Sequence, residues 1–217
     1  WIWGCKSMTN EEFTIIKGKY ANEFSTLGGF EHRVDGDSEV AMYSMVREYK
    51  PVSCLEVGPW EGGSTIAIMS ALLANKKKFE YVCSELDDNR RKLTADHTAQ
   101  QCGRSPVMIG DITKNLSMVP KKIDFLFHDT DHDLATTQWV LDNIFPRLTP
   151  GALVVFHDWA VTEENDKWSG KGIDGCGGWP ETQLLMDLHH AGKLPLKKLY
   201  WNYKNPGEWE TGFFIKI

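Results

Sequence analysis

Five short apolar runs alternate with helical stretches through the middle of the chain, and this rhythm limits the fold more than any other feature. The runs are "VSCLEV", "EYVCSEL", "PVMIGD", "DFLFHD" and "ALVVFHDW", and helical patterns lie between them near residues 64–75, 87–101 and 133–147. Apolar strands joined by crossover helices are typical of parallel sheets that are buried on both faces. The pattern therefore predicts an α/β fold with a doubly wound, mostly parallel sheet and helices on both faces.

Further elements are expected on both sides of this core. Thr9 and Glu12 have the spacing of a capping box, which predicts a first helix, and a second is expected from about Ser38 to Tyr49. At the other end "LKKLYWNY" and "TGFFIKI" flank "KNPGEWE", which predicts an antiparallel hairpin. Residues 159–180 are rich in glycine and charge, and we expect a mobile loop or lid there.

Size and charge exclude several classes of protein. The chain has 217 residues, 41% of them hydrophobic, which suits a single domain over residues 1–217. Its net charge of −6 argues against binding nucleic acid or an anionic membrane surface. No apolar run approaches the roughly 20 residues that span a bilayer, and no signal peptide is recognisable at the start.

The cysteines and the first residue bear on where the protein works. The five cysteines lack paired C-x-x-C spacing, and Cys54 and Cys83 fall in strand-like runs, so we expect buried thiols and a reducing, cytoplasmic compartment. The chain begins with Trp1 instead of Met. This suggests a segment cut from a longer protein.

A glycine-rich turn follows the first strand run. "CLEVGPWEGGSTIAI" places Gly58, Gly62 and Gly63 between a strand and a helix, where backbone can approach a ligand and the helix offers free N–H groups. The spacing is neither G-x-G-x-x-G nor a Walker motif, which disfavours dinucleotides and triphosphates. Glu85 ends the second run, where a carboxylate can bind ribose hydroxyls, and Asp111 ends the third. Together these residues predict a nucleoside site.

With these motifs the chain resembles the class I S-adenosylmethionine-dependent methyltransferases, over about residues 35–217. "LEVGPWEGGST", "FLFHDTDH" and "GALVVFHDW" are similar to the branch that includes macrocin-type sugar O-methyltransferases and cephalosporin-hydroxylase-like proteins. The resemblance implies a seven-stranded sheet whose last strand, "TGFFIKI", inserts antiparallel. The first fifty residues match the family less well, and we expect residues 1–50 to form a helical cover on the substrate side.

The resemblance further implies which residues bind S-adenosylmethionine. Glu56 and Gly58 would line the methionine side, Glu85 would hold the ribose, and Asp111 with Ile112 would face the adenine. The full set of residues expected to bind the cofactor is Glu56, Gly58, Pro59, Trp60, Gly62, Ser64, Glu85, Leu86, Asp111, Ile112 and Asp129.

The stretch "FLFHDTDHD" crowds carboxylates that repel one another unless something separates or neutralises them. Asp133 directly precedes a helical pattern and is expected to cap it. Asp129, with His157 and Asp158 at the next strand end, suits Mg²⁺ or Mn²⁺. A cation could bind two hydroxyls of an acceptor and lower their pKa. Metal-dependent members of the branch carry an acidic pair where this chain has His157-Asp158, so a metal-free site stays open as an alternative.

Methyl transfer to a hydroxyl also needs a base. We expect His132, or failing that Asp129, to accept the proton, while a histidine that ties the loop to the sheet by a hydrogen bond is the alternative. Asp131, Trp168 and Trp179 are expected to contact the acceptor, since exposed tryptophans suit the apolar face of a sugar.

We therefore predict an O-methyltransferase that uses S-adenosylmethionine and is assisted by Mg²⁺ or Mn²⁺ at the site named above. The expected acceptor is a small molecule, most simply a sugar or glycan, and a longer parent protein could carry glycosyltransferase-type domains. Two alternatives are kept: a nucleoside-binding module of the same fold without catalysis, and a metal-dependent catechol-like O-methyltransferase. A nicotinamide-dependent dehydrogenase is disfavoured by the glycine spacing.

Overall fold

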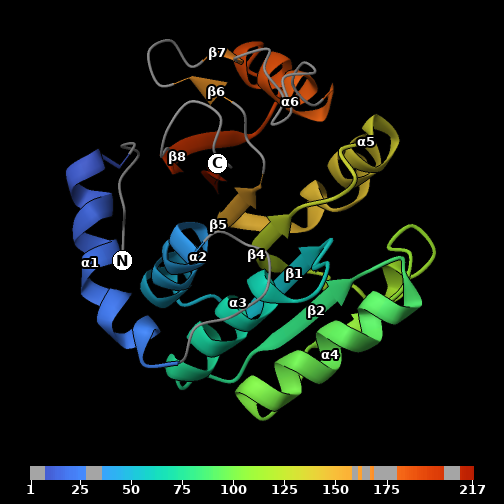
Figure 1. Cartoon of the computed structure of the whole chain (residues 1–217). Helices are drawn as coiled ribbons and strands as arrows, with labels where there is room; N and C mark the ends of the chain where they lie inside the picture. Colours follow the sequence, from blue (N-terminus) through green and yellow to red (C-terminus); the bar gives the residue numbers. More distant parts are fainter. Residues whose placement is uncertain (1–7, 28–35, 158–160, 163–166, 169–179, 203–210) are drawn as a thin grey trace.

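The computed structural model describes residues 8–27, 36–157, 161–162, 167–168, 180–202 and 211–217 (Figure 1). Its helices are α1 (Asn10–Ser25), α2 (Gly36–Tyr49), α3 (Gly63–Ala74), α4 (Asp88–Cys102), α5 (Leu134–Asn143) and α6 (Pro180–His190), with 3₁₀ turns at Leu116–Met118 and Phe145–Arg147. Its strands are β1 (Ser53–Val57), β2 (Glu80–Ser84), β3 (Val107–Ile109), β4 (Ile123–His128), β5 (Leu148–Phe156), β6 (Val161–Thr162), β7 (Lys167–Trp168), β8 (Leu196–Asn202) and β9 (Thr211–Lys216).

The sheet has seven strands in the order β3-β2-β1-β4-β5-β9-β8, with β6 and β7 forming a separate pair. The strands β1 to β5 run parallel, and β9 lies antiparallel between β5 and β8. The doubly wound sheet, its antiparallel last strand and the C-terminal hairpin are thus confirmed. Strand order reverses between β1 and β4, which is where ligands bind in open α/β sheets.

Two apolar cores lie on opposite faces of the sheet. Alternate residues of β4 divide between them, because successive side chains of a strand point to opposite faces. Phe125 and Phe127 face α1, α2 and α3, whereas Leu126 faces α5 and α6. In Figure 1, α4 lies beside α3 and along β2.

The first helix begins and packs as its sequence dictates. Thr9 and Glu12 form the predicted capping box, each accepting a backbone N–H of the other. Buried Phe13, Tyr20 and Phe24 form one stripe of the helix, which matches the periodicity of an amphipathic helix. This stripe holds α1 against α2 and against the sheet, where Phe13 packs on Phe213.

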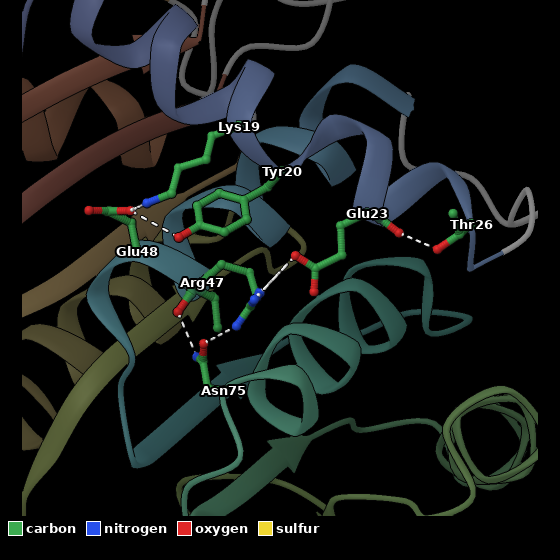
Figure 2. Close-up of polar contacts among 8 residues, drawn as sticks. Lys19, Tyr20, Glu23, Thr26, Arg47, Glu48 and Asn75 are labelled. Atoms are coloured by element: carbon green, nitrogen blue, oxygen red, sulfur yellow. Dashed lines mark hydrogen bonds and ion pairs between the residues drawn. The ribbon is translucent and has the colours of Figure 1, made fainter.

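Polar contacts add to this packing at the junction of α1, α2 and α3 (Figure 2). Glu48 accepts hydrogen bonds from Lys19 at 2.8 Å and from Tyr20 at 3.1 Å. Arg47 bridges Glu23 on α1 and Asn75 at the end of α3. The three helices are therefore linked by side chains as well as by their core.

One predicted helix ends earlier than expected. The pattern over residues 133–147 indicated one continuous helix, but α5 ends at Asn143 and a 3₁₀ turn, Phe145–Arg147, follows. Pro146 explains the difference, since proline lacks the N–H that a continuing helix would need. Asp133 caps α5 as predicted, because its side chain accepts the Thr136 N–H at 2.8 Å.

Cys54 and Cys83 are buried free thiols, as expected. None of the helices in the described ranges is long and apolar enough to cross a membrane. Most of the predicted lid, residues 159–180, lies outside the described residues.

Candidate active site

The carboxyl ends of β1 to β5 surround a cavity of about 720 Å³, a volume ordinary for small-molecule sites. It lies where the strand order reverses. Residues predicted to bind the cofactor that line this cavity are Gly58, Pro59, Trp60, Ser64, Glu85, Leu86, Asp111, Ile112 and Asp129. Asp131, His132 and His157 line it as well. Sequence-distant strand ends thus meet at one site.

Gly58 brings the end of β1 against the loop after β4. It adopts φ +85°, which favours glycine, and a Cβ there would lie 1.5 Å from the carbonyl oxygen of Asp129. The Asp129 N–H donates to the carbonyl of Val57 at 2.9 Å, which holds the loop in place. The close approach that the glycine turn suggested is therefore made to the chain's own backbone.

Trp60 forms one wall of the cavity in an unusual conformation. Its φ of 51° is rare for a residue with a large side chain, and such positions cluster at functional sites. Thr94 donates a hydrogen bond to the Trp60 carbonyl at 2.8 Å, and the Arg90 guanidinium lies 3.2 Å from the ring centroid. Both contacts come from α4, so this helix fixes the wall.

Glu56 lies behind the cavity and is not part of its lining. Its side chain is fully buried and accepts hydrogen bonds from Ser64, Thr65, Tyr81 and Cys83. Burial raises the pKa of Glu56, although these four donors favour the ionised form. Because the donors come from α3 and β2, Glu56 fastens the start of α3 to the sheet.

Gly62 also lies outside the lining. It precedes α3 with φ +96°, and a Cβ there would lie 3.3 Å from the Thr94 side chain. Its lack of a side chain lets α3 and α4 approach each other.

Glu85 and Asp111 differ in how many hydrogen bonds their carboxylates accept from neighbouring residues. Glu85 is mostly buried, and one oxygen accepts the Asp87 N–H at 3.0 Å. Burial raises the pKa of Glu85. Asp111 accepts from the Thr113 hydroxyl and from Lys114, and these bonds hold its pKa below the usual value. Glu85 therefore faces the cavity with more of its bonding capacity open than Asp111.

Asp129 and His157, two of the three predicted metal ligands, lie close together. The His157 Nδ1 lies 3.5 Å from Asp129 Oδ2. The third predicted ligand, Asp158, lies outside the described residues. Within the described ranges, no three His, Cys, Asp or Glu side chains form a cluster that could hold a metal. The pair alone does not complete the shell of Mg²⁺ or Mn²⁺, which take several oxygen ligands.

The side chain of His132 is held by the carboxylate of a residue far away in the sequence. Its Nδ1 lies 2.9 Å from Oε1 of Glu181 on α6, and the side chains are only 9% and 3% exposed. The other oxygen of Glu181 accepts from the Thr137 hydroxyl at 2.8 Å. His132 therefore ties the loop to helix α6, whereas the sequence hypothesis expected a tie to the sheet, and the same residue lines the cavity.

The lining is strongly acidic. Among the described residues it contains one guanidinium, that of Arg90, and seven carboxylates, which belong to Glu61, Glu85, Asp87, Asp111, Asp129, Asp131 and Asp133. Such a field favours a cationic ligand over a neutral or anionic one.

Two predicted acceptor residues are not described at the level of side chains. Trp179 lies outside the described residues, and for Trp168 only the backbone is described, in β7. This strand packs against α6, the helix that carries Glu181. No residue of α1 or α2 is among the described lining of the cavity, so a substrate-side role for them stays a prediction.

Sequence patterns did not single out Glu181 or Arg90. Glu181 follows Pro180 in the first turn of a helix, where an acid is ordinary. Arg90 belongs to the charged start "DNRRK" of α4, which indicates a solvated surface. Only the packing of α6 and α4 brings these two side chains to the site.

Comparisons with known proteins agree with this arrangement. Residues 55–159 match the model of a protein family described as a methyltransferase domain. No curated protein sequence matches the chain. The matched segment contains the glycine turn, Glu85 and the loop after β4.

Solved structures share the fold at low sequence identity. An O-methyltransferase from Bacillus cereus in complex with SAH is 14% identical, with a TM-score of 0.64 over 96% of this chain and 92% of that one. The O-methyltransferase TomG from Streptomyces achromogenes, involved in tomaymycin synthesis and solved with SAM, is 16% identical, with a TM-score of 0.62 over 97% and 91%. SAH-bound Podospora anserina PaMTH1 is 14% identical, with a TM-score of 0.58 over 99% and 91%. Residues 55–159 are thus similar to a methyltransferase domain, and the chain shares its fold with solved O-methyltransferases.

Proposed function

We propose that this protein is a methyltransferase that transfers the methyl group of S-adenosylmethionine to a hydroxyl oxygen of a small polar acceptor. One observation carries the proposal: a single cavity of about 720 Å³ is lined by the glycine turn, by Glu85 and by His132. The residues predicted to bind a nucleoside and the candidate base therefore line the same cavity, which supports a reaction between a nucleoside cofactor and a protic acceptor.

The lining residues fit S-adenosylmethionine in one direction. Gly58 and Ser64 offer backbone and hydroxyl groups to the methionine end, while Glu85 can accept hydrogen bonds from the ribose. Leu86, 65% exposed, and Ile112 offer apolar surface to the adenine. The carboxylate of Asp111 accepts hydrogen bonds from Thr113 in its own turn. Asp111 would therefore contact the adenine end through its backbone.

When bound, the cofactor supplies an electrophilic methyl carbon, which the acceptor oxygen attacks in line as the carbon–sulfur bond breaks. The residues of the chain hold the reactants and manage the proton. His132 accepts the hydroxyl proton and later releases it to solvent. The carboxylates of the lining favour the positively charged cofactor over its neutral product.

We further propose a sugar or similar polyol as the acceptor, with assistance from Mg²⁺ or Mn²⁺. Asp129 and His157 would hold the ion, together with Asp158 and oxygens of the acceptor. Vicinal hydroxyls of a sugar or a catechol would suit such a site equally. The acceptor experiment below therefore includes both.

Detection of S-adenosylhomocysteine tests the proposal. The protein would be incubated with S-adenosylmethionine and with panels of sugars, phenols and amines, each with and without Mg²⁺ or Mn²⁺. We expect turnover with a hydroxyl acceptor and none with amines. Binding of S-adenosylmethionine without turnover on any panel would favour the alternative, a nucleoside-binding module, and turnover only with amines would refute transfer to oxygen.

A further inference from the structure

The carboxylate of Glu181, on α6, contacts two neighbouring segments that lie more than 40 positions earlier in the sequence. It accepts at Oε1 from His132, in the loop after β4, and at Oε2 from Thr137, one turn into α5. Glu181 is 2% exposed and Thr137 is 1% exposed. Both carboxylate oxygens thus have a partner, as a buried acid requires.

This arrangement fixes the chemistry of the imidazole ring. A carboxylate only accepts hydrogen bonds, so the ring donates through Nδ1–H. The neutral ring then carries its basic lone pair on Nε2, since the hydrogen bond of one nitrogen sets the state of the other. His132 lines the cavity, and Glu181 does not.

The backbone of His132 has a conformation that residues other than glycine rarely adopt. His132 has φ 59°, in the left-handed region that residues with a Cβ rarely adopt. Such a conformation persists only where surrounding contacts enforce it. The bond to Glu181 is one such contact, and Thr137 in turn limits the movement of Glu181.

We infer that Glu181 is a positioning residue that holds His132 as the Nδ1–H tautomer and presents Nε2 as the proton acceptor for methyl transfer. This inference rests on the proposed function. When Nε2 accepts the hydroxyl proton, the positive charge of the ring lies beside the Glu181 carboxylate, which stabilises it. The proton stays on Nε2 until solvent takes it, and Glu181 itself gains none.

The tautomer can be measured without any turnover. Histidine ¹⁵N chemical shifts distinguish a protonated from an unprotonated ring nitrogen, and the His132→Asn variant assigns the signal. In the wild-type protein at a pH where the ring is neutral, we expect Nδ1 protonated and Nε2 unprotonated. A wild-type ring protonated on Nε2 would overturn the inference.

Variants of Glu181 distinguish the effect of its hydrogen bond to His132 from the effect of its negative charge. Glu181→Ala removes the acceptor, so the ring should revert to the Nε2–H tautomer that predominates in free histidine. Glu181→Gln still accepts through its carbonyl and should keep the Nδ1–H tautomer. Thr137→Val leaves Glu181 in place and should retain the tautomer with weaker orientation. Gln183→Ala is the matched control on α6, because Gln183 bonds to Asp187 on an exposed part of that helix.

Kinetics then connect the tautomer with the reaction. Glu181→Ala should lower kcat by about 100-fold, within the range of general-base catalysis, and should leave the KM for S-adenosylmethionine unchanged. Glu181→Gln should retain more activity than Glu181→Ala. A kcat that stays at the wild-type value in Glu181→Ala, or a loss confined to KM, would assign the contact to structure alone.

The two proposals can fail separately. If the wild-type ring is the Nδ1–H tautomer but no acceptor is methylated, the proposed function fails and the positioning by Glu181 stands. If turnover occurs with the ring protonated on Nε2, the function stands and the role of Glu181 fails.

Discussion

A Cβ on Gly58 would lie 1.5 Å from the carbonyl oxygen of Asp129, closer than any two such atoms can approach. This relationship couples the turn after β1 to the loop after β4. Both segments line the cavity, so a side chain at position 58 must move one of them.

Gly58→Ala should therefore abolish binding of S-adenosylmethionine, both through this clash and through the strain of φ +85°. Calorimetry on folded protein would measure the loss. Gly18→Ala is the matched control, since a Cβ on Gly18 in α1 would meet nothing within 4 Å. Undiminished binding by folded Gly58→Ala would remove the turn from the cofactor site.

The role assigned to Glu85 predicts a loss confined to the cofactor. Glu85→Gln keeps the shape but replaces the charged acceptor, so binding of S-adenosylmethionine should weaken by about 1–3 kcal/mol. Affinity for the acceptor should barely change. Glu80→Gln, at the exposed start of the same strand, is the control. Equal weakening of both ligands by Glu85→Gln would point to general damage.

Periodicity predicted the fold because buried parallel strands must be apolar and each must be followed by a crossover. The same reasoning placed Glu85, Asp129 and His157 together, since parallel strands end at one edge of the sheet. The alternation of side chains along β1 also bears on Glu56, which the resemblance assigned to the cofactor site. Glu56 alternates with Leu55 and Val57, so its side chain points to the face of the sheet that α3 covers and away from the cavity.

Other parts of the site depend on packing that no local pattern encodes. The contact between His132 and Glu181 spans 49 positions of the sequence. It exists only because α6 packs beside α5. Asp111 shows the opposite case, because Thr113 and Lys114 satisfy its carboxylate within its own turn. Position at a strand end therefore does not guarantee that a carboxylate is available to a ligand.

The acidic lining predicts that salt distinguishes cofactor from product. S-Adenosylmethionine carries a sulfonium charge that S-adenosylhomocysteine lacks, and seven carboxylates surround the cavity among the described residues. Raising the ionic strength screens this field, so the affinity for S-adenosylmethionine should fall more steeply than that for S-adenosylhomocysteine. Calorimetric titrations of both ligands over a series of salt concentrations would measure the two slopes. Parallel slopes would contradict an electrostatic preference for the cofactor.

Removal of metal tests the role proposed for Asp129 and His157. Exhaustive chelation should lower turnover by orders of magnitude, and Mg²⁺ or Mn²⁺ should restore it. Asp158→Asn should have a similar effect while the affinity for S-adenosylmethionine, measured by calorimetry, stays nearly intact. Full activity after chelation would exclude metal assistance and leave His132 and Asp129 as a metal-free acid–base pair.

The contacts of Glu48 predict how pH affects the attachment of α1. Burial disfavours the ionised form of Glu48, but hydrogen bonds from Lys19 and Tyr20 outweigh it and lower its pKa from 4.5. The unfolded chain therefore binds the proton more readily than the folded protein. The stabilisation is complete above about pH 4.5 and is lost as the pH falls through the lowered pKa.

Lys19, which donates to Glu48, makes stability depend on pH in the opposite direction at high pH. The hydrogen bond to Glu48 raises the pKa of Lys19 above 10.5, so its contribution is complete below that value and is lost as the pH rises through the raised pKa. Glu48→Gln removes both effects and keeps the shape of the side chain. Its Tm should lie about 2–4 °C below that of the wild type near neutral pH, and the two curves should converge in acid.

An exposed ion pair provides the control for this comparison. Asp96→Asn breaks the contact of Asp96 with Lys92 on α4, where both side chains are more than half exposed. Exposed pairs contribute little, so this variant should follow the wild-type curve of Tm against pH. If Glu48→Gln also follows that curve, the contacts of Glu48 in Figure 2 do not stabilise the junction of α1 and α2.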